Sequence, residues 1–280
     1  MTRLSARYKT ALVTGGTSGL GLAFTRMLVA EGVAVTILSR RASPELPTTC
    51  THCELDLADG AAVEVALAAG KVVPESYDIL INNAGCGVFA PLEIFPAEAI
   101  GKQLCLMLET PIRLTHAALP GMLARQRGAI VNVASLAARF PLPYESLYNT
   151  CKAGLSNFTR SVIQETVGSG VAVVDFQPGD FRTAFNQATQ RNPDLFAKYP
   201  HLEKAWGRLE SNLEHSLLPE KAAAHLRKVL LKGHSGTVAT GDVFQSIIAP
   251  LLARGAPERL LLWCLRVYFS MPKHRTARRA

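Results

Sequence analysis

The sequence lacks the long apolar runs that insert into or cross membranes. None of its 280 residues belongs to an uninterrupted apolar stretch of the roughly 18 residues that a membrane-spanning helix needs. Residues 1–9 are charged and contain no apolar segment of the length found in secretory signal peptides. Without an export signal, the six cysteines are expected to be free thiols rather than a disulfide framework. We therefore expect a cytoplasmic protein.

Acidic residues are absent from the last ten positions, and this accounts for much of the net charge of +8. The two ends together contribute +7 of it, through Arg3, Arg7, Lys9, Lys273, Arg275, Arg278 and Arg279. The remainder of the chain is nearly neutral and has no basic run interleaved with aromatic residues. Nucleic-acid binders usually carry such a face on a folded element, so we expect no nucleic-acid partner.

The sequence also offers little for a metal ion. Cys50, His52 and Cys53 resemble a metal-binding pair, but they fall in a predicted strand at 49–53. Side chains alternate between the two faces of a strand, which places Cys50 and His52 opposite Cys53. No second pair occurs elsewhere, so we expect no metal site.

What the sequence does contain is an alternation of short β-branched runs with longer helical stretches. This alternation is typical of βαβ units and predicts a Rossmann-type, doubly wound α/β fold, with a mostly parallel sheet covered by helices on both faces. We expect one domain over residues 1–280, with a substrate-covering helical lid at 184–235. The predicted strands are 10–14, 33–38, 49–53, 77–82, 129–134, 171–176 and 237–240, and the main predicted helices are 19–31, 58–70, 97–124 and 144–167.

A glycine-rich turn joins the first strand to the first helix. Glycines allow a tight turn and a close approach of backbone to phosphate, and the helix N-terminus offers free N–H groups to an anion. Its position directly after the first strand predicts a dinucleotide cradle rather than a merely structural turn. The residues expected to form the cradle are Gly15, Thr17, Ser18, Gly19, Leu20 and Gly21.

The end of the second predicted strand favours NADP(H) over NAD(H). It contains Ser39, Arg40 and Arg41, with no carboxylate to accept a hydrogen bond from the ribose 2′-hydroxyl. A guanidinium suits the 2′-phosphate instead. The alternative is a pair of solvated charges at a strand end.

Tyr148 and Lys152 are spaced to lie one turn apart on the same face of a predicted helix. A phenol has a pKa of about 10 and exchanges protons poorly near neutral pH. A neighbouring ammonium group stabilises the phenolate and lowers this pKa, which is the requirement for a tyrosine that acts as an acid or base.

These motifs together resemble the classical short-chain dehydrogenase/reductase family over nearly the whole chain. The resemblance rests on the turn Thr-Gly-x-x-x-Gly-x-Gly at 14–21, the segment Asn-Asn-Ala-Gly at 82–85, and Ser135 thirteen residues before Tyr148 of Tyr-x-x-x-Lys. Pro178 and Gly179, followed by Thr183, complete the order. The resemblance implies a seven-stranded Rossmann sheet, hydride transfer between a carbonyl and an alcohol, and a homodimer or homotetramer formed through the helices at 97–124 and 144–167.

The resemblance also implies roles for individual residues. Tyr148 is expected to be the general acid in reduction, Lys152 to lower its pKa and hold the nicotinamide ribose, and Ser135 to donate to the substrate oxygen. The remaining expected cofactor contacts are Asp56 at the adenine, Leu57 beside it, Asn83, Ala84 and Gly85 along the floor, and Pro178, Gly179, Phe181 and Thr183 near the carboxamide.

One position departs from the family pattern. The family usually has an asparagine in the helix before the fifth strand, where it supports a water that links the lysine to solvent; here Met107 takes that place. A thioether is a weak acceptor and cannot replace an amide. We expect slower turnover without loss of hydride transfer, unless Gln103 one turn earlier substitutes. The alternative function is an NADP(H)-binding sensor or scaffold with little catalysis.

Apolar residues near the expected cleft favour a bulky hydrophobic or lipid-like ketone or alcohol as the substrate. They are Cys86, Val88, Phe89, Phe140, Leu142, Phe185, Leu195, Phe196, Tyr199 and Trp206, some of which core packing alone explains. Neither Cys86 nor Cys151 has a neighbour that would activate its thiol.

Residues 257–280 form an amphipathic, basic extension. An apolar helix with aromatic residues and trailing cations suits the surface of a membrane, although it is too short to cross a bilayer. A peripheral membrane contact would fit a lipid-like substrate. The alternatives are an arm packed over the lid and a surface for a dimer partner.

Overall fold

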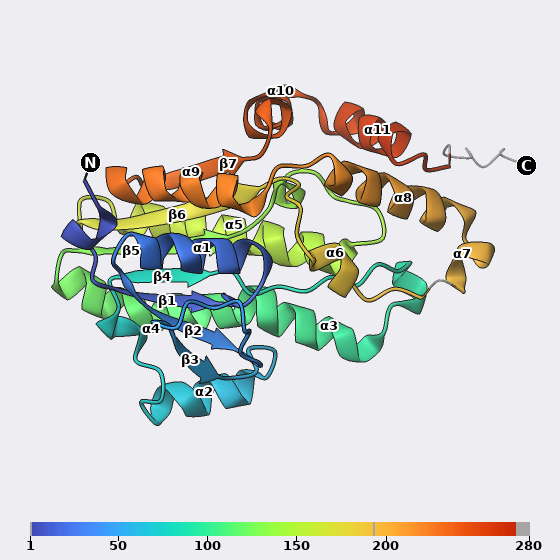
Figure 1. Ribbon diagram of the computed structural model, residues 1–280. Helices are drawn as coiled ribbons and strands as arrows, with labels where there is room; N and C mark the ends of the chain where they lie inside the picture. Colours follow the sequence, from blue (N-terminus) through green and yellow to red (C-terminus); the bar gives the residue numbers. More distant parts are fainter. Residues whose placement is uncertain (1, 193, 273–280) are drawn as a thin grey trace, which may run out of the picture.

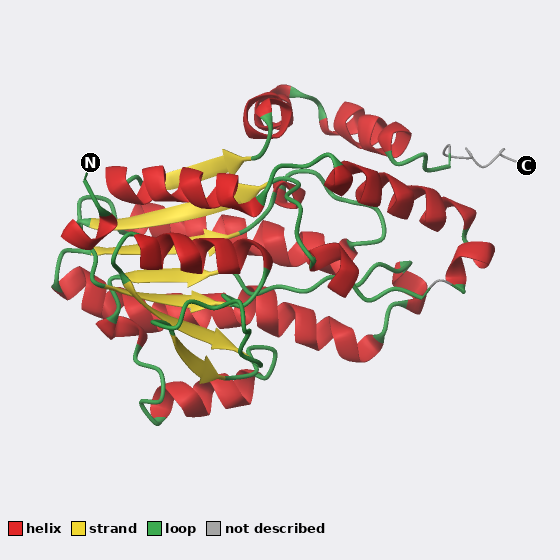
Figure 2. Cartoon of the chain, in the orientation of Figure 1, coloured by secondary structure: helices red, strands yellow, loops and turns green. Residues whose placement is uncertain are grey.

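A central seven-stranded sheet lies between two layers of helices in the computed structural model, which describes residues 2–192 and 194–272 (Figure 1). Figure 2 shows the strands stacked as one twisted layer with helices in front and behind. The strands are β1 (Thr10–Thr14), β2 (Ala34–Ser39), β3 (Thr51–Glu54), β4 (Ile79–Asn82), β5 (Gly128–Val133), β6 (Val171–Pro178) and β7 (Gly236–Thr240).

Helices separate successive strands as far as β6, except that β2 leads to β3 without a helix. They are α1 (Gly19–Ala30), α2 (Gly60–Ala68), α3 (Ala97–Leu104), α4 (Thr110–Ala124), α5 (Ser146–Glu165), α6 (Phe185–Ala188), α7 (Leu195–Lys198), α8 (Pro200–Glu214), α9 (Pro219–Lys232), α10 (Ala249–Gly255) and α11 (Glu258–Tyr268). Two π-helical segments, η4 (Cys105–Glu109) and η6 (Phe244–Ile248), and short 3₁₀ turns at Leu4–Ala6, Pro74–Ser76, Leu92–Ile94 and Leu136–Ala138 complete the chain.

The strand order β3-β2-β1-β4-β5-β6-β7 places the functional motifs at one edge of the sheet. Every neighbouring pair is parallel, so all the carboxyl ends meet at the same edge. The chain moves outward from β1 to β3 and then returns to β4 beside β1, which makes a topological switch point. Open α/β sheets bind their ligands in the crevice at such a point.

Successive side chains along each strand point to opposite faces of the sheet, and each face contributes to its own apolar core. Val13 and Phe176 face α1 and α9, where Phe24 and Leu226 are fully buried. Phe24 meets Phe176 edge to face, with ring centroids 5.9 Å apart. On the other face, strand residues such as Leu12 and Leu80 pack on α2, α4 and α5. The strands are therefore apolar on both faces, as a parallel sheet covered on both sides requires.

The predicted Rossmann-type fold is confirmed, with local differences. The predicted helix at 97–124 is interrupted by the π-helical segment η4, and β6 continues two residues further than predicted, to Pro178. Strand β3 begins at Thr51, so Cys50 lies outside it. Among the described residues, no group of three or more His, Cys, Asp or Glu side chains is arranged to hold a metal ion.

The segment predicted as a lid, 184–235, has two parts. Helices α6, α7 and α8 extend beyond the carboxyl edge of the sheet, whereas α9 packs along α1 in the helical layer (Figure 1). The prediction was wrong for α9, because its residues Leu226 and Leu230 are apolar at the spacing that buries them on the sheet.

Helix α11 lies against α8. The Tyr268 hydroxyl donates to Asn212 Oδ1 at 2.7 Å, and Phe269 is buried in the cluster around Trp206. The final basic segment, 273–280, lies outside the described residues. In the part of the chain that the structure describes, no helix is both long enough and apolar enough to pass through a bilayer.

Candidate active site

A cleft of about 1520 Å³ follows the carboxyl edge of the sheet from the glycine-rich turn to the C-terminal helices. It brings together every site residue that the sequence predicts. The lining includes Gly15, Thr17, Ser18, Gly19, Leu20, Gly21, Ser39, Arg40, Arg41, Asp56, Leu57, Asn83, Ala84, Gly85, Ser135, Tyr148, Lys152, Pro178, Gly179, Phe181 and Thr183.

The turn between β1 and α1 is built for close backbone approach. Gly15 has a φ of +63°, and a Cβ there would lie 2.9 Å from the Ala84 Cα. A Cβ on Gly21 would collide with the Gly15 carbonyl oxygen. The turn ends at the N-terminus of α1, where Ser18 makes no side-chain cap. Free N–H groups and a backbone without side chains fit the diphosphate of a dinucleotide.

Hydrogen bonds connect this turn to the segment after β4. The Thr14 hydroxyl accepts from the backbone N–H groups of Asn83 and Ala84, at 2.9 and 3.0 Å. The Asn83 amide donates back to the carbonyl oxygens of Thr14 and Gly15. The two walls of the cofactor half are therefore held at a fixed separation.

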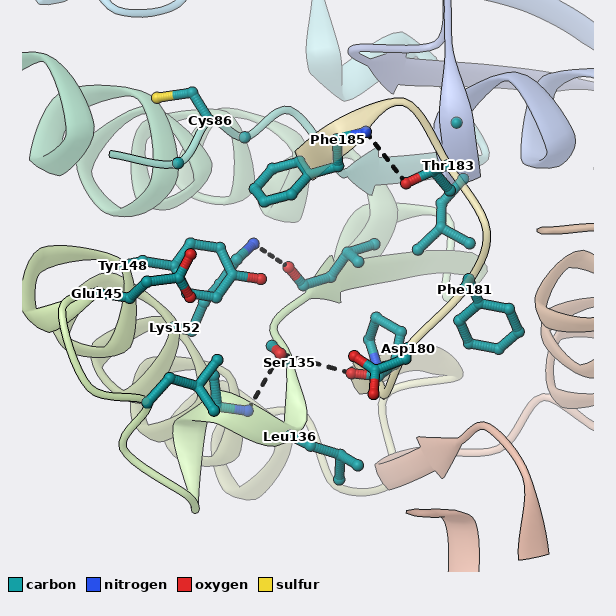
Figure 3. A pocket seen from close by; sticks show the side chains of 18 of the residues that line it. Cys86, Ser135, Leu136, Glu145, Tyr148, Lys152, Asp180, Phe181, Thr183 and Phe185 are labelled. Carbon is teal, nitrogen blue, oxygen red and sulfur yellow. Dashed lines mark hydrogen bonds between the residues drawn. The ribbon is translucent and has the colours of Figure 1, made fainter. Parts of the chain in front are cut away.

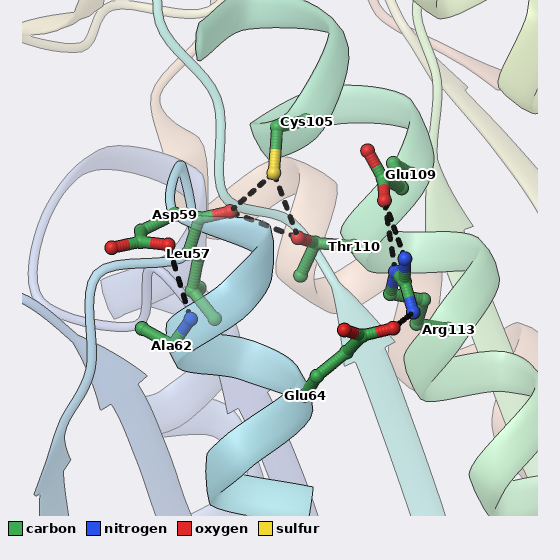
Figure 4. Close-up of polar contacts among 8 residues, drawn as sticks. All are labelled: Leu57, Asp59, Ala62, Glu64, Cys105, Glu109, Thr110 and Arg113. Atoms are coloured by element: carbon green, nitrogen blue, oxygen red, sulfur yellow. Dashed lines mark hydrogen bonds and ion pairs between the residues drawn. The ribbon is translucent and has the colours of Figure 1, made fainter.

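The loop after β3 is anchored from the opposite wall. The Leu57 carbonyl oxygen accepts from the Thr110 hydroxyl at 2.9 Å, and the Cys105 thiol lies 3.8 Å from the same oxygen (Figure 4). Arg113 pairs with Glu109 on its own helix and with Glu64 of α2. These contacts fix Asp56 and Leu57 at the edge of the cleft where the sequence predicts the adenine.

Two arginines stand at the end of β2. Arg40 and Arg41 are exposed and form no ion pair with the described acidic residues. The Ser39 hydroxyl is engaged, because it donates to the Arg41 carbonyl oxygen at 2.9 Å and lies 2.9 Å from His52 Nε2. The cations are accessible to an anion bound in the cleft.

Ser135, Tyr148 and Lys152 converge at the centre of the cleft (Figure 3). The Lys152 ammonium donates to the Val133 carbonyl oxygen at 2.7 Å and lies 5.7 Å from the centroid of the Tyr148 ring. Ser135 caps the 3₁₀ turn after β5, accepting from the Ala137 N–H at 3.1 Å. The Ser135 hydroxyl, the Tyr148 phenol and the Lys152 ammonium group thus lie together in the cleft.

The electrostatics of this volume differ from the expected acidification of Tyr148. Burial raises the pKa of the Tyr148 phenol well above its usual range, and the Glu145 and Asp180 carboxyl groups raise it further. The Ser135 hydroxyl lowers this pKa. Burial also lowers the pKa of Lys152, to about 8. The sequence expectation counted the Lys152 cation and omitted two acidic neighbours and the desolvation of the phenol.

Met107 is fully buried in η4, and a Cβ on Gly85 would lie 3.5 Å from its sulfur atom. It therefore lies directly under the expected cofactor floor. Gln103 lines the cleft one turn earlier, and its amide donates to the Cys86 carbonyl oxygen at 3.3 Å. The effect of Met107 on turnover stays a prediction.

The apolar residues predicted near the cleft divide into two groups. Cys86, Val88, Phe140, Leu142 and Phe185 line it, and the Phe185 ring lies 5.8 Å from that of Tyr148. The prediction was wrong for the others, which pack in an apolar cluster with Leu202 and Leu209 of α8 and Leu265 of α11. The others are Phe89, Leu195, Phe196, Tyr199 and Trp206.

Sequence reasoning missed two acidic residues of the cleft. Glu145 precedes α5, three residues before Tyr148, and is 6% exposed. Asp180 follows Gly179 in a motif whose other residues were predicted. Both line the cleft, and the burial of each raises its pKa, that of Glu145 to about 7. Their placement next to predicted residues was the available signal.

The two cysteines near these motifs have no activating environment. Burial raises the pKa of the Cys86 thiol, and it raises that of Cys151 to about 11. Both are therefore neutral thiols at physiological pH, as the sequence predicts.

Comparison with known proteins gives consistent matches. A family profile described as short chain dehydrogenase matches residues 9–194. A short chain dehydrogenase of Pseudocercospora fijiensis is 32% identical over 217 residues, which cover 72% of this chain and 69% of that protein. The 3-ketodihydrosphingosine reductase of Bacteroides thetaiotaomicron is 26% identical over 269 residues, covering 93% and 97%. A solved serine dehydrogenase, in a closed form complexed with NADP⁺, is 27% identical, with a TM-score of 0.69 over 85% of this chain and 96% of that one.

The raised pKa of Glu145 predicts a pH-dependent cost to stability. An unfolded glutamate titrates near about 4.3, whereas Glu145 in the folded protein titrates at about 7. The folded state therefore holds the proton more tightly, and the free energy of unfolding falls as the pH rises between these values. We expect Glu145→Gln to be more stable than the wild type at pH 8 by up to about 3 kcal/mol, and the gain to vanish near pH 4.

Urea unfolding at several pH values measures this difference. Glu165→Gln, at the exposed far end of α5, is the matched control and should change stability little at any pH. A gain for Glu145→Gln that is equal at pH 4 and pH 8 would contradict the predicted titration.

Proposed function

Because this chain belongs to the short chain dehydrogenase family, whose members are nicotinamide-dependent oxidoreductases of alcohols and ketones, we propose that it is an NADP(H)-dependent ketoreductase. The proposed substrate is a bulky hydrophobic or lipid-like ketone, reduced to its alcohol. The observation that carries the proposal is the meeting of Ser135, Tyr148 and Lys152 in one cleft with the glycine-rich turn.

Each of these residues has a defined task in the proposed reaction. Bound NADPH supplies the hydride, and NADP⁺ accepts it in the reverse direction. Ser135 donates a hydrogen bond to the carbonyl oxygen and so favours negative charge there. Tyr148 donates the proton that this oxygen needs as the alcohol forms. Lys152, fixed by the Val133 carbonyl oxygen, holds its positive charge beside the phenol and contacts the cofactor ribose.

Four features support the choice of NADP(H) and of an apolar substrate. Arg40 and Arg41 are exposed at the end of β2, where a 2′-phosphate would lie. The similar serine dehydrogenase was solved with NADP⁺. Val88, Phe140 and Phe185 give the other half of the cleft apolar walls. The similarity to a 3-ketodihydrosphingosine reductase over most of both chains favours a lipid-like ketone.

The segment 184–218 is proposed to act as a lid. Its residues Ala184, Phe185 and Ala188 line the cleft that Ser135 and Tyr148 also line, and the end of α8 lines the cleft as well. Closing this segment would exclude water from the reacting groups.

Met107 is the reason for a second candidate function, an NADP(H)-binding sensor or scaffold. An apolar side chain that is fully buried beneath Gly85 leaves no amide at the position where the family places its water-binding asparagine. A protein that binds NADP(H) as a sensor or scaffold would tolerate this change. The intact Ser135, Tyr148 and Lys152 favour the enzyme, because a binding protein needs no acid and base.

Replacing Tyr148 with Phe tests the proposed catalysis. The variant lacks the proton donor, so kcat/KM for ketones in the presence of NADPH should fall at least about 100-fold, while NADPH still binds. Loss of cofactor absorbance with a panel of aliphatic and aryl ketones measures turnover, and cofactor fluorescence measures binding. Tyr77→Phe, far from the cleft, is the control. Turnover at the wild-type rate in Tyr148→Phe would refute the mechanism.

Replacing Arg40 with Glu tests the cofactor. Loss of a charge-assisted hydrogen bond to the 2′-phosphate, with a like charge in its place, should lower kcat/KM for NADPH by about 10- to 100-fold. The value for NADH should stay the same or rise. Arg3→Glu, at the opposite edge of the sheet, controls for net charge. An unchanged ratio of NADPH to NADH efficiency would argue against the predicted 2′-phosphate site.

We also propose that the protein is a cytoplasmic homo-oligomer with a peripheral membrane contact. The contact would use the exposed apolar face of α11, where Leu260, Trp263 and Val267 lie at helical spacing beside Arg259. An arm that only packs on α8 is the alternative, which Phe269 and Tyr268 favour through their contacts with that helix.

Trp263→Glu tests the membrane contact. The substitution places a charge where apolar burial is proposed, so co-sedimentation with vesicles containing anionic phospholipid should fall strongly. Val65→Glu, an equally exposed apolar position on α2, is the control. Equal sedimentation of all three proteins would remove the proposal, and a change of oligomeric state measured by light scattering would favour the dimer surface instead.

A further inference from the structure

The Glu145 side chain is nearly buried, and its carboxyl group lines the cleft without a hydrogen-bond partner among the described residues. It lines the cleft beside the Tyr148 ring (Figure 3). With 6% of the residue exposed, it accepts no hydrogen bond from the residues that the structure describes. Burying a carboxylate without a partner is costly, and natural proteins retain such groups mainly at sites of function.

A second carboxyl group of the cleft, that of Asp180, is fixed in place. Gln245 holds Asp180 by two hydrogen bonds: its amide donates to Asp180 Oδ2 at 2.7 Å, and its carbonyl oxygen accepts from the Asp180 N–H at 3.0 Å. Gln245 is itself held by the Asp242 carboxylate, which accepts from its N–H at 2.7 Å. Asp180 is therefore oriented rather than mobile, and one of its oxygens remains available.

The Asp180 charge acts on Glu145, and both groups act on the Tyr148 phenol. The negative charge of Asp180 contributes to the raised pKa of Glu145, and both carboxyl groups contribute to the raised pKa of Tyr148.

We propose that Glu145 and Asp180 form a subsite for an ammonium group of the substrate, so that the substrate is an amino ketone and the product an amino alcohol. This inference rests on the proposed ketoreductase function. Since both carboxyl groups flank the phenol that meets the carbonyl oxygen, the amine belongs on a carbon adjacent to the carbonyl or on the next one. The apolar walls around Phe140 and Phe185 take the rest of the chain.

An ammonium group in this place also assists the chemistry. It offsets the two negative charges that raise the pKa of Tyr148, and so makes the phenol a better acid than it is in the empty cleft. The redox step is otherwise unchanged: the carbonyl carbon gains the hydride, the C=O π bond breaks, and the oxygen takes the Tyr148 proton. Conversely, a substrate with a carboxylate or phosphate near its carbonyl would be repelled.

A matched pair of alcohols tests the subsite in the oxidative direction, where the amine is chemically stable. The probes are 2-aminooctan-3-ol and octan-3-ol, with NADP⁺ at pH 7.5 and the absorbance of NADPH as the signal. We expect wild-type kcat/KM to be at least about tenfold higher for the amino alcohol, the size expected from one charge-assisted hydrogen bond. Glu145→Gln and Asp180→Asn should each reduce this preference by about tenfold, and Glu165→Gln should leave it at the wild-type value.

Calorimetric titration of both alcohols into the protein, with and without NADP⁺, gives a measurement independent of turnover. Tighter binding of the amino alcohol that is lost in Glu145→Gln supports the subsite even if neither alcohol is oxidised, and in that case only the proposed ketoreductase activity fails. Oxidation of octan-3-ol with no preference for the amino alcohol, together with equal binding of the two, would overturn the subsite and leave the ketoreductase proposal intact. Equal binding without any oxidation would overturn both.

Discussion

The hydrogen bonds between Thr14 and Asn83 join the carboxyl ends of the parallel strands β1 and β4. These two strands flank the point at which the strand order of the sheet reverses. The hydroxyl, amide and backbone groups of Thr14 and Asn83 fully engage one another, so the glycine-rich turn and the segment 83–85 form one rigid surface. Everything in the cleft is placed relative to that surface. Met107 supports it from below, and Ser135 and Pro178 follow the next two strands along the same edge.

The electrostatic balance around Tyr148 is the second constraint. A phenol in a buried site needs stabilisation of its ionised form before it can exchange protons near neutral pH. In the protein alone, desolvation and two acidic neighbours raise the pKa of the Tyr148 phenol, and only the Ser135 hydroxyl lowers it. The pKa of Tyr148 therefore depends on the charge of the bound cofactor, of the bound substrate or of both. That dependence connects substrate recognition with proton transfer.

The fold and the centre of the site could be predicted from the sequence because each depends on local signals. The seven strands follow from β-branched runs, and the glycine-rich turn and the Tyr148–Lys152 spacing lie within short segments. The missed features depend on contacts between distant segments. Trp206 and Phe89 were expected at the cleft but pack against each other, with ring centroids 5.0 Å apart, under a C-terminal helix whose position no local pattern reveals. The acidic character of Glu145 was visible in the sequence, but its burial depends on tertiary packing around the cleft.

The interruption of the predicted helix at 97–124 has a similar origin. The sequence there is compatible with continuous helix, and the π-helical segment Cys105–Glu109 arises where Cys105 and Thr110 must both reach the Leu57 carbonyl oxygen. Tertiary contact thus overrides local propensity at a point next to the cofactor floor.

The wall opposite the glycine-rich turn is made by the last third of the chain. Residues of α8, η6, α10 and α11 line the far end of the cleft, whereas all the predicted dinucleotide contacts precede position 184. Substitutions after position 205 can therefore reshape what the cleft admits while the phosphate-holding half is left intact. A gene copy diverging only in its 3′ portion could acquire a new substrate without having to reinvent its redox chemistry.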